Sequence, residues 1–268
     1  MTEPSGPGSV AGRPPWLRRH SLLWIGSAHH EAVCTQISDA PLRKTVADWL
    51  AAGCPVVVRR QAAELFLSSR IGVGIPLPPS RGKQRVALEI TPESIAASAP
   101  PPLLSDVISR LARSRRTVLS QLVRDADSIG LALRVYGSAA WEALTGRSHL
   151  TPQSDIDLWW RPMSRRQLAE GVAMLARWER AGNVRADGEI VFGDDDAVAW
   201  REWMQAGARR TDASVLVKTT WGSRLDSARS LLAMLPGRET VEYATVSVCP
   251  GGAFQRGAAG REPSVNDC

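Results

Sequence analysis

The chain reads Val135-Tyr136-Gly137-Ser138 and then, sixteen residues after the serine, Ser154-Asp155-Ile156-Asp157-Leu158-Trp159. The first stretch ends an apolar, strand-like run and opens a helical one. The second places two aspartates one residue apart, and such residues of a strand face the same way about 6.6 Å apart. Two like charges held that close favour a cation between them, and Mg²⁺ prefers oxygen ligands and shared phosphate oxygens. Together the two stretches predict a nucleotidyl-transfer site.

The Gly-Ser pair is the candidate phosphate-binding turn. Gly137 removes a side chain where the backbone has to approach a triphosphate. Ser138 would cap the helix that begins at Ala139 and donate its hydroxyl to a phosphate oxygen, and backbone N–H groups at a helix N-terminus also favour an anion. Many strands end in Gly-Ser, so the pair gains its meaning from the aspartates that follow it.

The aspartate pair has a simpler alternative, in which Asp155 and Asp157 are solvent-facing residues of an edge strand. Their neighbours Ile156, Leu158 and Trp159 are apolar, which indicates a largely buried strand. Unpaired carboxylates are costly in such a place, so a bound cation is the better interpretation.

A two-metal site usually needs a third carboxylate, and Asp187 and Glu189 share one face of the next predicted strand. The alternative there is a β-turn at Asp187-Gly188. Glu202 is a lower-ranked candidate. Lys218 ends an apolar strand and would neutralise the β- and γ-phosphates or the leaving pyrophosphate. Equally, it would extend from the strand end into solvent.

Basic residues gather in the first half of the chain, at Arg59, Arg60, Lys83 and Arg85. They would face an acidic partner or the substrate phosphates, or they form a plain solvated surface. Neither His20 nor His149 has a metal-ligand partner at short spacing, so we assign neither as a ligand.

The composition of the chain limits the classes of protein to which it can belong. The chain has 268 residues, is 44% hydrophobic and carries a net charge of +6, which favours an acidic partner. Its four cysteines form no Cys-x-x-Cys pair, which argues against a zinc ribbon and a disulfide framework and fits a reducing compartment. No apolar run is long enough for a transmembrane helix. Residues 1–15 indicate a flexible leader rather than a signal peptide, so we expect a cytoplasmic protein.

Strand and helix patterns alternate in the second half, which predicts an α/β fold. We expect an N-terminal domain over 16–97, a helical connection over 98–125, a second domain over 126–245 and a disordered tail over 246–268. The expected strands are at 20–25, 55–60, 84–90, 131–136, 155–160, 185–192, 197–203 and 214–218. The expected helices are at 41–52, 139–144, 164–181 and 224–235, and the glycine- and proline-rich segment 72–82 is expected to be a structured loop.

Longer motifs resemble those of the malonate decarboxylase holo-acyl-carrier-protein synthase family, also called phosphoribosyl-dephospho-CoA transferase. They include Arg134-Val135-Tyr136-Gly137-Ser138-Ala139-Ala140-Trp141-Glu142-Ala143-Leu144-Thr145-Gly146 and Ser154-Asp155-Ile156-Asp157-Leu158. Further similar motifs lie at 19–24, 53–60, 74–79, 83–85, 187–189, 200–203 and 215–219. The resemblance spans roughly 16–235, so only the two ends of the chain lie outside it.

The resemblance implies a polymerase-β-like nucleotidyltransferase domain with a smaller N-terminal α/β domain. It implies transfer of 2′-(5-triphosphoribosyl)-3′-dephospho-CoA to a serine of the apo-acyl-carrier subunit of malonate decarboxylase, with formation of a phosphodiester and release of pyrophosphate. The family's two catalytic aspartates map onto Asp155 and Asp157, which would hold Mg²⁺. The gap between Ser138 and Asp155 is longer than in many nucleotidyltransferases and fits this family.

Two other functions remain open at this point. The equivalent synthase for citrate lyase would use the same donor on another carrier, and the motifs above favour the malonate enzyme. A catalytically silent module would bind nucleotide or an acidic protein, although both aspartates are retained. A nucleic-acid binder is disfavoured, because the basic residues are spread out and form no recognition helix.

Overall fold

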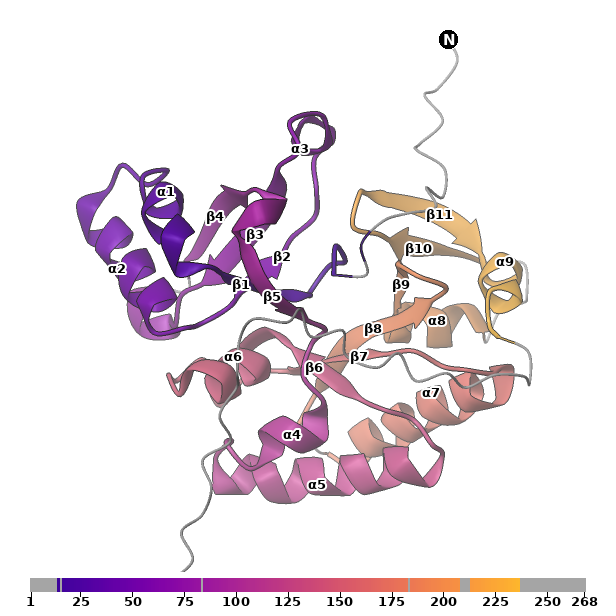
Figure 1. Cartoon of the computed structure of the whole chain (residues 1–268). Helices are drawn as coiled ribbons and strands as arrows, with labels where there is room; N and C mark the ends of the chain where they lie inside the picture. Colours follow the sequence, from indigo (N-terminus) through magenta and orange to yellow (C-terminus); the bar gives the residue numbers. More distant parts are fainter. Residues whose placement is uncertain (1–13, 15, 83, 183, 208–212, 237–268) are drawn as a thin grey trace, which may run out of the picture.

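The computed structural model describes residues 14, 16–82, 84–182, 184–207 and 213–236, and the account below concerns these residues. The expected tail at 246–268, and the expected leader at 1–15 apart from Pro14, lie outside them. Within the described residues the chain mixes helices and strands in two sheets, so the predicted α/β class is confirmed (Figure 1). The finer, polymerase-β-like arrangement stays a prediction.

The first sheet has five strands in the order β4-β3-β2-β1-β5, and every neighbouring pair is antiparallel. Its strands are β1 (Leu22–Ile25), β2 (Val56–Val58), β3 (Ile71–Pro76), β4 (Arg85–Ile90) and β5 (Ile95–Ala99). Beside it lie α1 (His30–Cys34), α2 (Ala40–Ala51) and α3 (Ala63–Leu67). In α2, Asp39 caps the first turn by accepting from the Leu42 N–H at 2.8 Å, and Val46, Trp49 and Leu50 turn a buried face to the core.

The second sheet has six strands in the order β11-β10-β9-β8-β7-β6. They are β6 (Arg134–Tyr136), β7 (Ile156–Trp160), β8 (Ala186–Phe192), β9 (Asp196–Ala199), β10 (Ser214–Lys218) and β11 (Ser223–Ser227). The pair β7–β8 is parallel and is joined by α7 (Arg165–Arg180), whereas the other pairs are antiparallel. The remaining helices are α4 (Leu104–Ile108), α5 (Arg113–Ser128), α6 (Gly137–Thr145), α8 (Trp200–Gly207) and α9 (Ala228–Ala233).

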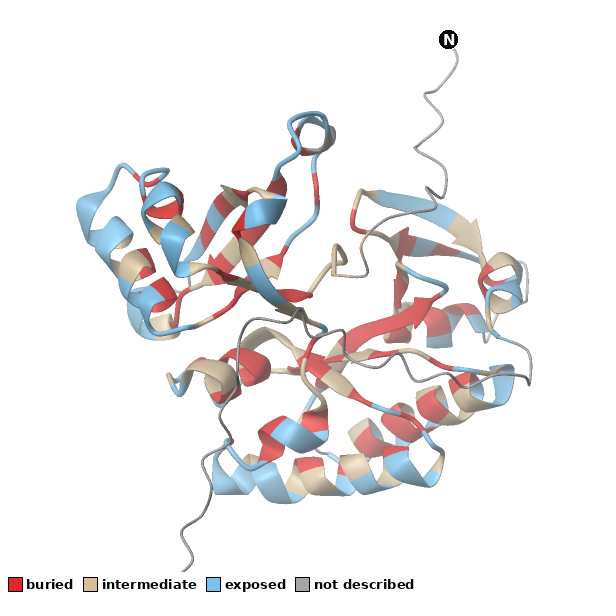
Figure 2. Cartoon of the chain, viewed as in Figure 1, coloured by how far each residue is buried: buried red, intermediate tan, exposed pale blue. Residues whose placement is uncertain are grey.

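Strand β7 lies inside this sheet and shows how the sheet positions the predicted site. Ile156, Leu158 and Trp160 are completely buried on one face. Asp157 and Trp159 point to the opposite face and are only partly buried, since successive side chains of a strand alternate. The buried face keeps the strand in register, because a slip of one residue would turn the apolar side chains to the other face. Figure 2 marks the buried stretches of this sheet, which are most continuous along β8.

Three expected elements were wrong. The supposed loop 72–82 contains most of β3, because Val73 and Ile75 are fully buried while Gly72 leaves room for the Arg59 and Leu65 side chains. Residues 200–203, expected in a strand, begin α8, whose Trp200 and Trp203 are buried at helical spacing. The expected helix at 224–235 starts as β11, and α9 begins only after Ser227, which accepts from the Ser230 N–H at 3.1 Å.

The expected helical connection at 98–125 also needs correction at its start. Residues 98 and 99 end β5, which pairs with β1 and so completes the first sheet. Helices α4 and α5 follow and pack on each other. The pattern Ile95–Ala99 is rich in alanine, which is a poor strand former, and the pairing partner β1 overrides that local preference.

The two sheets are joined by direct contacts. Trp141 of α6 is buried in the core of the first half, with its ring centroid 5.7 Å from that of Trp49. The Gln61 N–H donates to the Thr220 carbonyl oxygen at 2.7 Å, and the Arg19 N–H donates to the Thr220 hydroxyl at 3.0 Å. These contacts hold the walls of the cavity described below together.

Gly188 is expected to be indispensable for the β7–β8 pairing, and it lies within a strand rather than at the β-turn that Asp187-Gly188 suggested. Its φ is 134°, and a Cβ there would lie 1.9 Å from the Leu158 carbonyl oxygen. We expect Gly188→Ala to lower the free energy of unfolding by about 3 kcal/mol or more, because the obstacle is backbone. Urea denaturation measures this, and Gly207→Ala, where a Cβ meets nothing within 4 Å, is the matched control that should change little.

Candidate active site

Asp157 stands at the centre of the predicted site. In β7 it is paired with Tyr136 of the antiparallel β6 and with Asp187 of the parallel β8. Paired residues of neighbouring strands point to the same face, so the Asp157 and Asp187 side chains share a face of the sheet. Asp155 immediately precedes β7, and its carboxylate lies 3.7 Å from the Arg185 Nε.

Gly137 packs directly against the Asp157 carboxylate. A Cβ at Gly137 would lie 1.9 Å from Asp157 Oδ2, and the glycine has a φ of +64°. The turn from β6 into α6 is therefore closed to a side chain for two reasons, the left-handed backbone and the carboxylate beside it. Ser138 follows in the first turn of α6.

The carboxylates repel one another. Burial raises the pKa of Asp157, the negative charges of Asp187 and Asp155 raise it further, and Arg85 partly opposes them, which brings the pKa to about 6. Asp187 accepts a hydrogen bond from the N–H of Gly188 at 2.8 Å. The sheet thus holds negative charge in a place where it is unfavourable unless a cation joins it.

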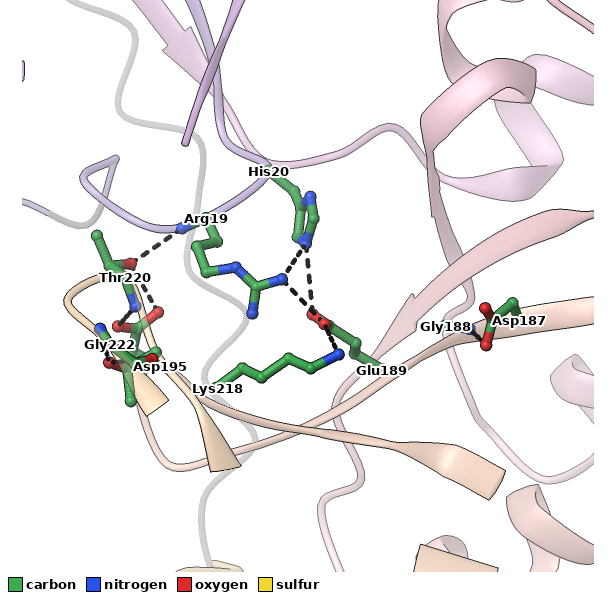
Figure 3. Close-up of polar contacts among 10 residues, drawn as sticks. Arg19, His20, Asp187, Gly188, Glu189, Asp195, Lys218, Thr220 and Gly222 are labelled. Carbon is green, nitrogen blue, oxygen red and sulfur yellow. Dashed lines mark hydrogen bonds and ion pairs between the residues drawn. The ribbon is translucent and has the colours of Figure 1, made fainter. Parts of the chain in front are cut away.

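Glu189 lies in a separate ion-pair cluster, made of Arg19, His20, Glu189 and Lys218 and called the Glu189 cluster below (Figure 3). Its carboxylate oxygens lie 2.9 Å from Arg19 Nη2, 3.3 Å from His20 Nε2 and 3.6 Å from Lys218 Nζ. Burial would raise the pKa of Glu189, but the hydrogen bond from His20 and the charge of Arg19 outweigh it and lower the pKa to about 2. Figure 3 shows Asp187 apart from this cluster.

The sequence predicted Glu189 at the metal and Lys218 at the phosphates, and the structure brings both into the Glu189 cluster instead. The lower-ranked Glu202 is placed elsewhere, since its Oε1 accepts from the Leu216 N–H at 2.6 Å. It ties α8 to β10 and lies outside the group around Asp157. Of the three candidates for a third carboxylate, Asp187 is the one paired with Asp157.

A cavity of about 470 Å³ opens between the two halves of the chain and reaches Asp157. Gly137 and Ser138 line it, as do three members of the predicted basic set, Arg59, Arg60 and Arg85. The fourth member, Lys83, lies outside the described residues. The volume of the cavity is within the range of small-molecule sites. The Asp157 carboxylate, a Gly-Ser turn and arginines from different parts of the sequence therefore meet at one cavity.

Sequence reasoning missed three residues that line the same cavity, Arg19, Tyr136 and His149. Arg19 donates from Nη2 to Glu189, and its other guanidinium nitrogen, Nη1, is buried with no hydrogen-bond partner. The Tyr136 ring stacks on His20 with centroids 4.0 Å apart, and burial with the nearby carboxylates raises its pKa, which keeps the phenol protonated. The motif at 19–24 was the available signal for Arg19, whereas His149 had none.

Within the described residues, no three His, Cys, Asp or Glu side chains form a group already arranged to hold a metal ion. In the same part of the chain, no helix combines the length and apolar character needed to span a membrane.

Comparison with known proteins places the chain in a family. The family model described as "Phosphoribosyl-dephospho-CoA transferase MdcG C-terminal domain" matches residues 103–229, and the corresponding N-terminal domain model matches residues 18–101. No solved structure matches the chain.

Curated relatives carry the same name. A "Phosphoribosyl-dephospho-CoA transferase" of Xanthomonas euvesicatoria pv. vesicatoria is 38% identical over 207 residues, which cover 77% of this chain and 92% of the relative. A protein of that name from Bradyrhizobium diazoefficiens is 34% identical over 202 residues, which cover 75% of this chain and 86% of the relative. The chain belongs to the phosphoribosyl-dephospho-CoA transferase family and is a transferase of the nucleotidyltransferase type.

Proposed function

We propose that the enzyme transfers the phosphoribosyl-dephospho-CoA group of 2′-(5-triphosphoribosyl)-3′-dephospho-CoA to a serine of the apo-acyl-carrier subunit of malonate decarboxylase, and releases pyrophosphate. The observation that carries this proposal is the convergence of Asp157, the Gly137-Ser138 turn and the arginines on one cavity. The choice of malonate decarboxylase rests on the sequence motifs, such as 134–146 and 154–158. The net charge of +6 suits both a polyphosphate donor and an acidic carrier.

The carboxylates fit a Mg²⁺ site in which the substrate phosphates supply some of the metal ligands. Burial raises the pKa of Asp157 and its carboxylate neighbours raise it further, so a bound cation would relieve the cost of their charges. Mg²⁺ is usually held by one or two carboxylates, several waters and substrate phosphates rather than by a closed protein cage. The absence of a ready-made three-residue group among the described residues agrees with that mode. We propose Asp155 and Asp157 as ligands, with Asp187 as the third carboxylate.

Glu189 is better explained as a counter-ion. Arg19, His20 and Lys218 occupy both of its oxygens, and the hydrogen bond from His20 and the charge of Arg19 lower its pKa, so the ionised form is already stabilised. We therefore propose that Glu189 orients Arg19, which lines the cavity and whose Nη1 has no hydrogen-bond partner, so that the guanidinium is suited to a donor phosphate. Lys218 would act through Glu189 rather than on the leaving group.

The reaction asks the protein mainly to position groups and neutralise charge. The serine oxygen of the carrier forms a bond to the α-phosphorus of the donor, and the bond from that phosphorus to the pyrophosphate oxygen breaks. Arg59, Arg60 and Arg85 are placed to neutralise the phosphates, while the backbone at Gly137 and Ser138 offers N–H groups at the start of α6. Bound Mg²⁺ would polarise the phosphoryl group and favour loss of the serine proton.

Arg85→Gln is expected to raise KM for the donor about tenfold with kcat less affected, because a phosphate contact made throughout the reaction is lost. Arg85 is exposed on β4 at the cavity wall, so folding should not change. Initial rates of transfer at varied donor concentration give both constants. The matched control is Arg81→Gln, an exposed arginine of the 3-10 helix at Pro79–Arg81, which should behave as wild type. An unchanged KM in Arg85→Gln would remove Arg85 from the donor site.

The carrier assignment is tested by offering purified apo-carriers of malonate decarboxylase and citrate lyase to the enzyme with donor and Mg²⁺. Intact-mass spectrometry should show the added group on the malonate decarboxylase carrier, and none when its acceptor serine is alanine. Modification of the citrate lyase carrier alone would overturn the assignment and leave the family activity in place.

A further inference from the structure

The cavity continues beyond the phosphate-binding end, along α6. Ala140 and Trp141 line it after Gly137 and Ser138, and four residues of helix displace Trp141 by about 6 Å from Gly137. His149 lines it as well and lies with Trp141 around the Trp49 ring, at centroid distances of 6.4 and 5.7 Å. We call Trp141 and His149 the Trp141–His149 wall. Other apolar lining side chains are Leu22, Val57, Ile75, Leu77 and Val86.

His149 is held in place and has an unused polar atom. The residue is 4% exposed, and its backbone N–H donates to Glu142 Oε2 at 3.1 Å, beside the Leu150 N–H at 3.0 Å. Its Nε2 atom is buried and has no hydrogen-bond partner. Buried polar groups in native proteins are nearly always satisfied, so an unpaired nitrogen at a cavity wall points to a ligand that completes it.

The imidazole is uncharged at neutral pH. Burial lowers the pKa of His149, and Arg147 lowers it too, against the opposing effect of Glu142. A neutral imidazole has one donor and one acceptor nitrogen. It therefore suits a neutral heteroatom edge better than a phosphate, and the apolar side chains around it suit flat, uncharged faces.

We propose that the Trp141–His149 wall binds the adenine base of the donor, with His149 hydrogen-bonded to the edge of the base. The inference rests on the proposed function for the donor itself. In a dephospho-CoA derivative the adenine is the flat aromatic group, and its edge carries both donors and acceptors. The pantetheine arm is thin and flexible and does not match a wall built from an indole and an imidazole. The phosphates of the donor belong at the arginine end of the cavity.

Binding of fragments, measured by calorimetry without carrier, separates the parts of the cavity. The probes are ADP, GDP, inorganic tripolyphosphate and 4′-phosphopantetheine. Wild type should bind ADP more tightly than GDP, because guanine presents a different edge. His149→Phe keeps the ring and removes its nitrogens, and it should weaken ADP binding about tenfold while leaving tripolyphosphate binding unchanged. His149→Gln, which has a donor and an acceptor, should recover part of the loss.

The control is His29→Phe, a partly buried histidine of the 3-10 helix at Ser27–His29 and outside the cavity lining, which should bind all probes as wild type does. Thermal unfolding checks that each variant is folded. Unchanged ADP binding by His149→Phe would overturn the proposal, as would an equal loss for tripolyphosphate, or a loss confined to 4′-phosphopantetheine. Because no transfer is measured here, failure of the proposed reaction would show separately, as absent modification of the carrier by wild type.

Discussion

Asp157→Asn is expected to reduce transfer activity by about a thousandfold or more while making the metal-free protein more stable above pH 6. The activity falls because an amide is a poor ligand for Mg²⁺ and supplies no negative charge. The stability rises because the substitution removes a carboxylate that its buried position and the neighbours Asp155 and Asp187 disfavour. A residue that serves only packing would not give opposite effects on activity and stability.

The pH dependence of that gain follows from the pKa of about 6, which lies above the ordinary aspartate pKa of 3.8. Folded protein binds this proton more tightly than unfolded protein, so the carboxyl stabilises the fold most at low pH, and this contribution is lost as pH rises towards 6. Above pH 6 the cost of the charge is complete, about 1–2 kcal/mol after allowance for partial exposure. The gain in Asp157→Asn should therefore appear at pH 8 and vanish near pH 4.

Urea denaturation in the presence of a chelator, at pH 4 and pH 8, measures this. Asp127→Asn, at an exposed aspartate of α5, is the matched control and should show no such difference. A destabilised Asp157→Asn at pH 8 would contradict the account of crowded charge. Full activity in that variant would contradict the role at the site.

Glu189→Gln is expected to lower the free energy of unfolding by about 3 kcal/mol at pH 7, because it leaves Arg19, His20 and Lys218 around a neutral amide. The pKa of Glu189, about 2, lies below the ordinary glutamate pKa of 4.5, so the ionised form is stabilised on folding. That stability is present above pH 4.5 and is lost as pH falls towards 2. The difference between wild type and variant should shrink over that interval.

Thermal and urea unfolding measure the loss, and Glu31→Gln, at an exposed residue of α1, is the control. Glu189→Gln also distinguishes a counter-ion role of Glu189 from a role as a metal ligand. If Glu189 is a counter-ion, Glu189→Gln should need the same Mg²⁺ concentration for half-maximal activity as wild type. A large increase in that concentration, with stability preserved, would instead return Glu189 to the metal site.

The spacing of apolar residues predicted much of the fold, because the buried face of a strand or helix follows that spacing. The alternation around Asp157 identified β7, and the helical spacing of Leu168 and Leu175 identified α7. Local patterns failed where tertiary pairing decides. Gly72 and Pro76 suggested a loop, yet β3 is held between β2 and β4. The strand β11 could not be separated from α9 by composition, because its pairing with β10 is a non-local contact.

In the candidate site, too, local sequence patterns were predictive and contacts between distant segments were not. Spacing in the sequence was enough to single out Asp155 and Asp157 as candidates, at and just before the start of β7. Parallel pairing of β7 with β8, which puts Asp187 beside Asp157, depends on topology. The cavity joins Arg85 of the first sheet to Gly137 at the start of α6, and the ion pair of Arg19 with Glu189 spans the two halves. No spacing rule reaches across such distances in sequence, which is why the ion pairs of Glu189 could not be predicted.

The most direct test of the central claim is the intact mass of the apo-carrier after incubation with donor, Mg²⁺ and either wild type or the double variant Asp155→Asn with Asp157→Asn. Wild type should add one phosphoribosyl-dephospho-CoA group to the acceptor serine and release one pyrophosphate, and a chelator should stop the reaction. The double variant, folded by the criterion of cooperative unfolding, should leave the carrier mass unchanged. Transfer by the double variant at the wild-type rate would contradict the claim that these aspartates form the catalytic centre.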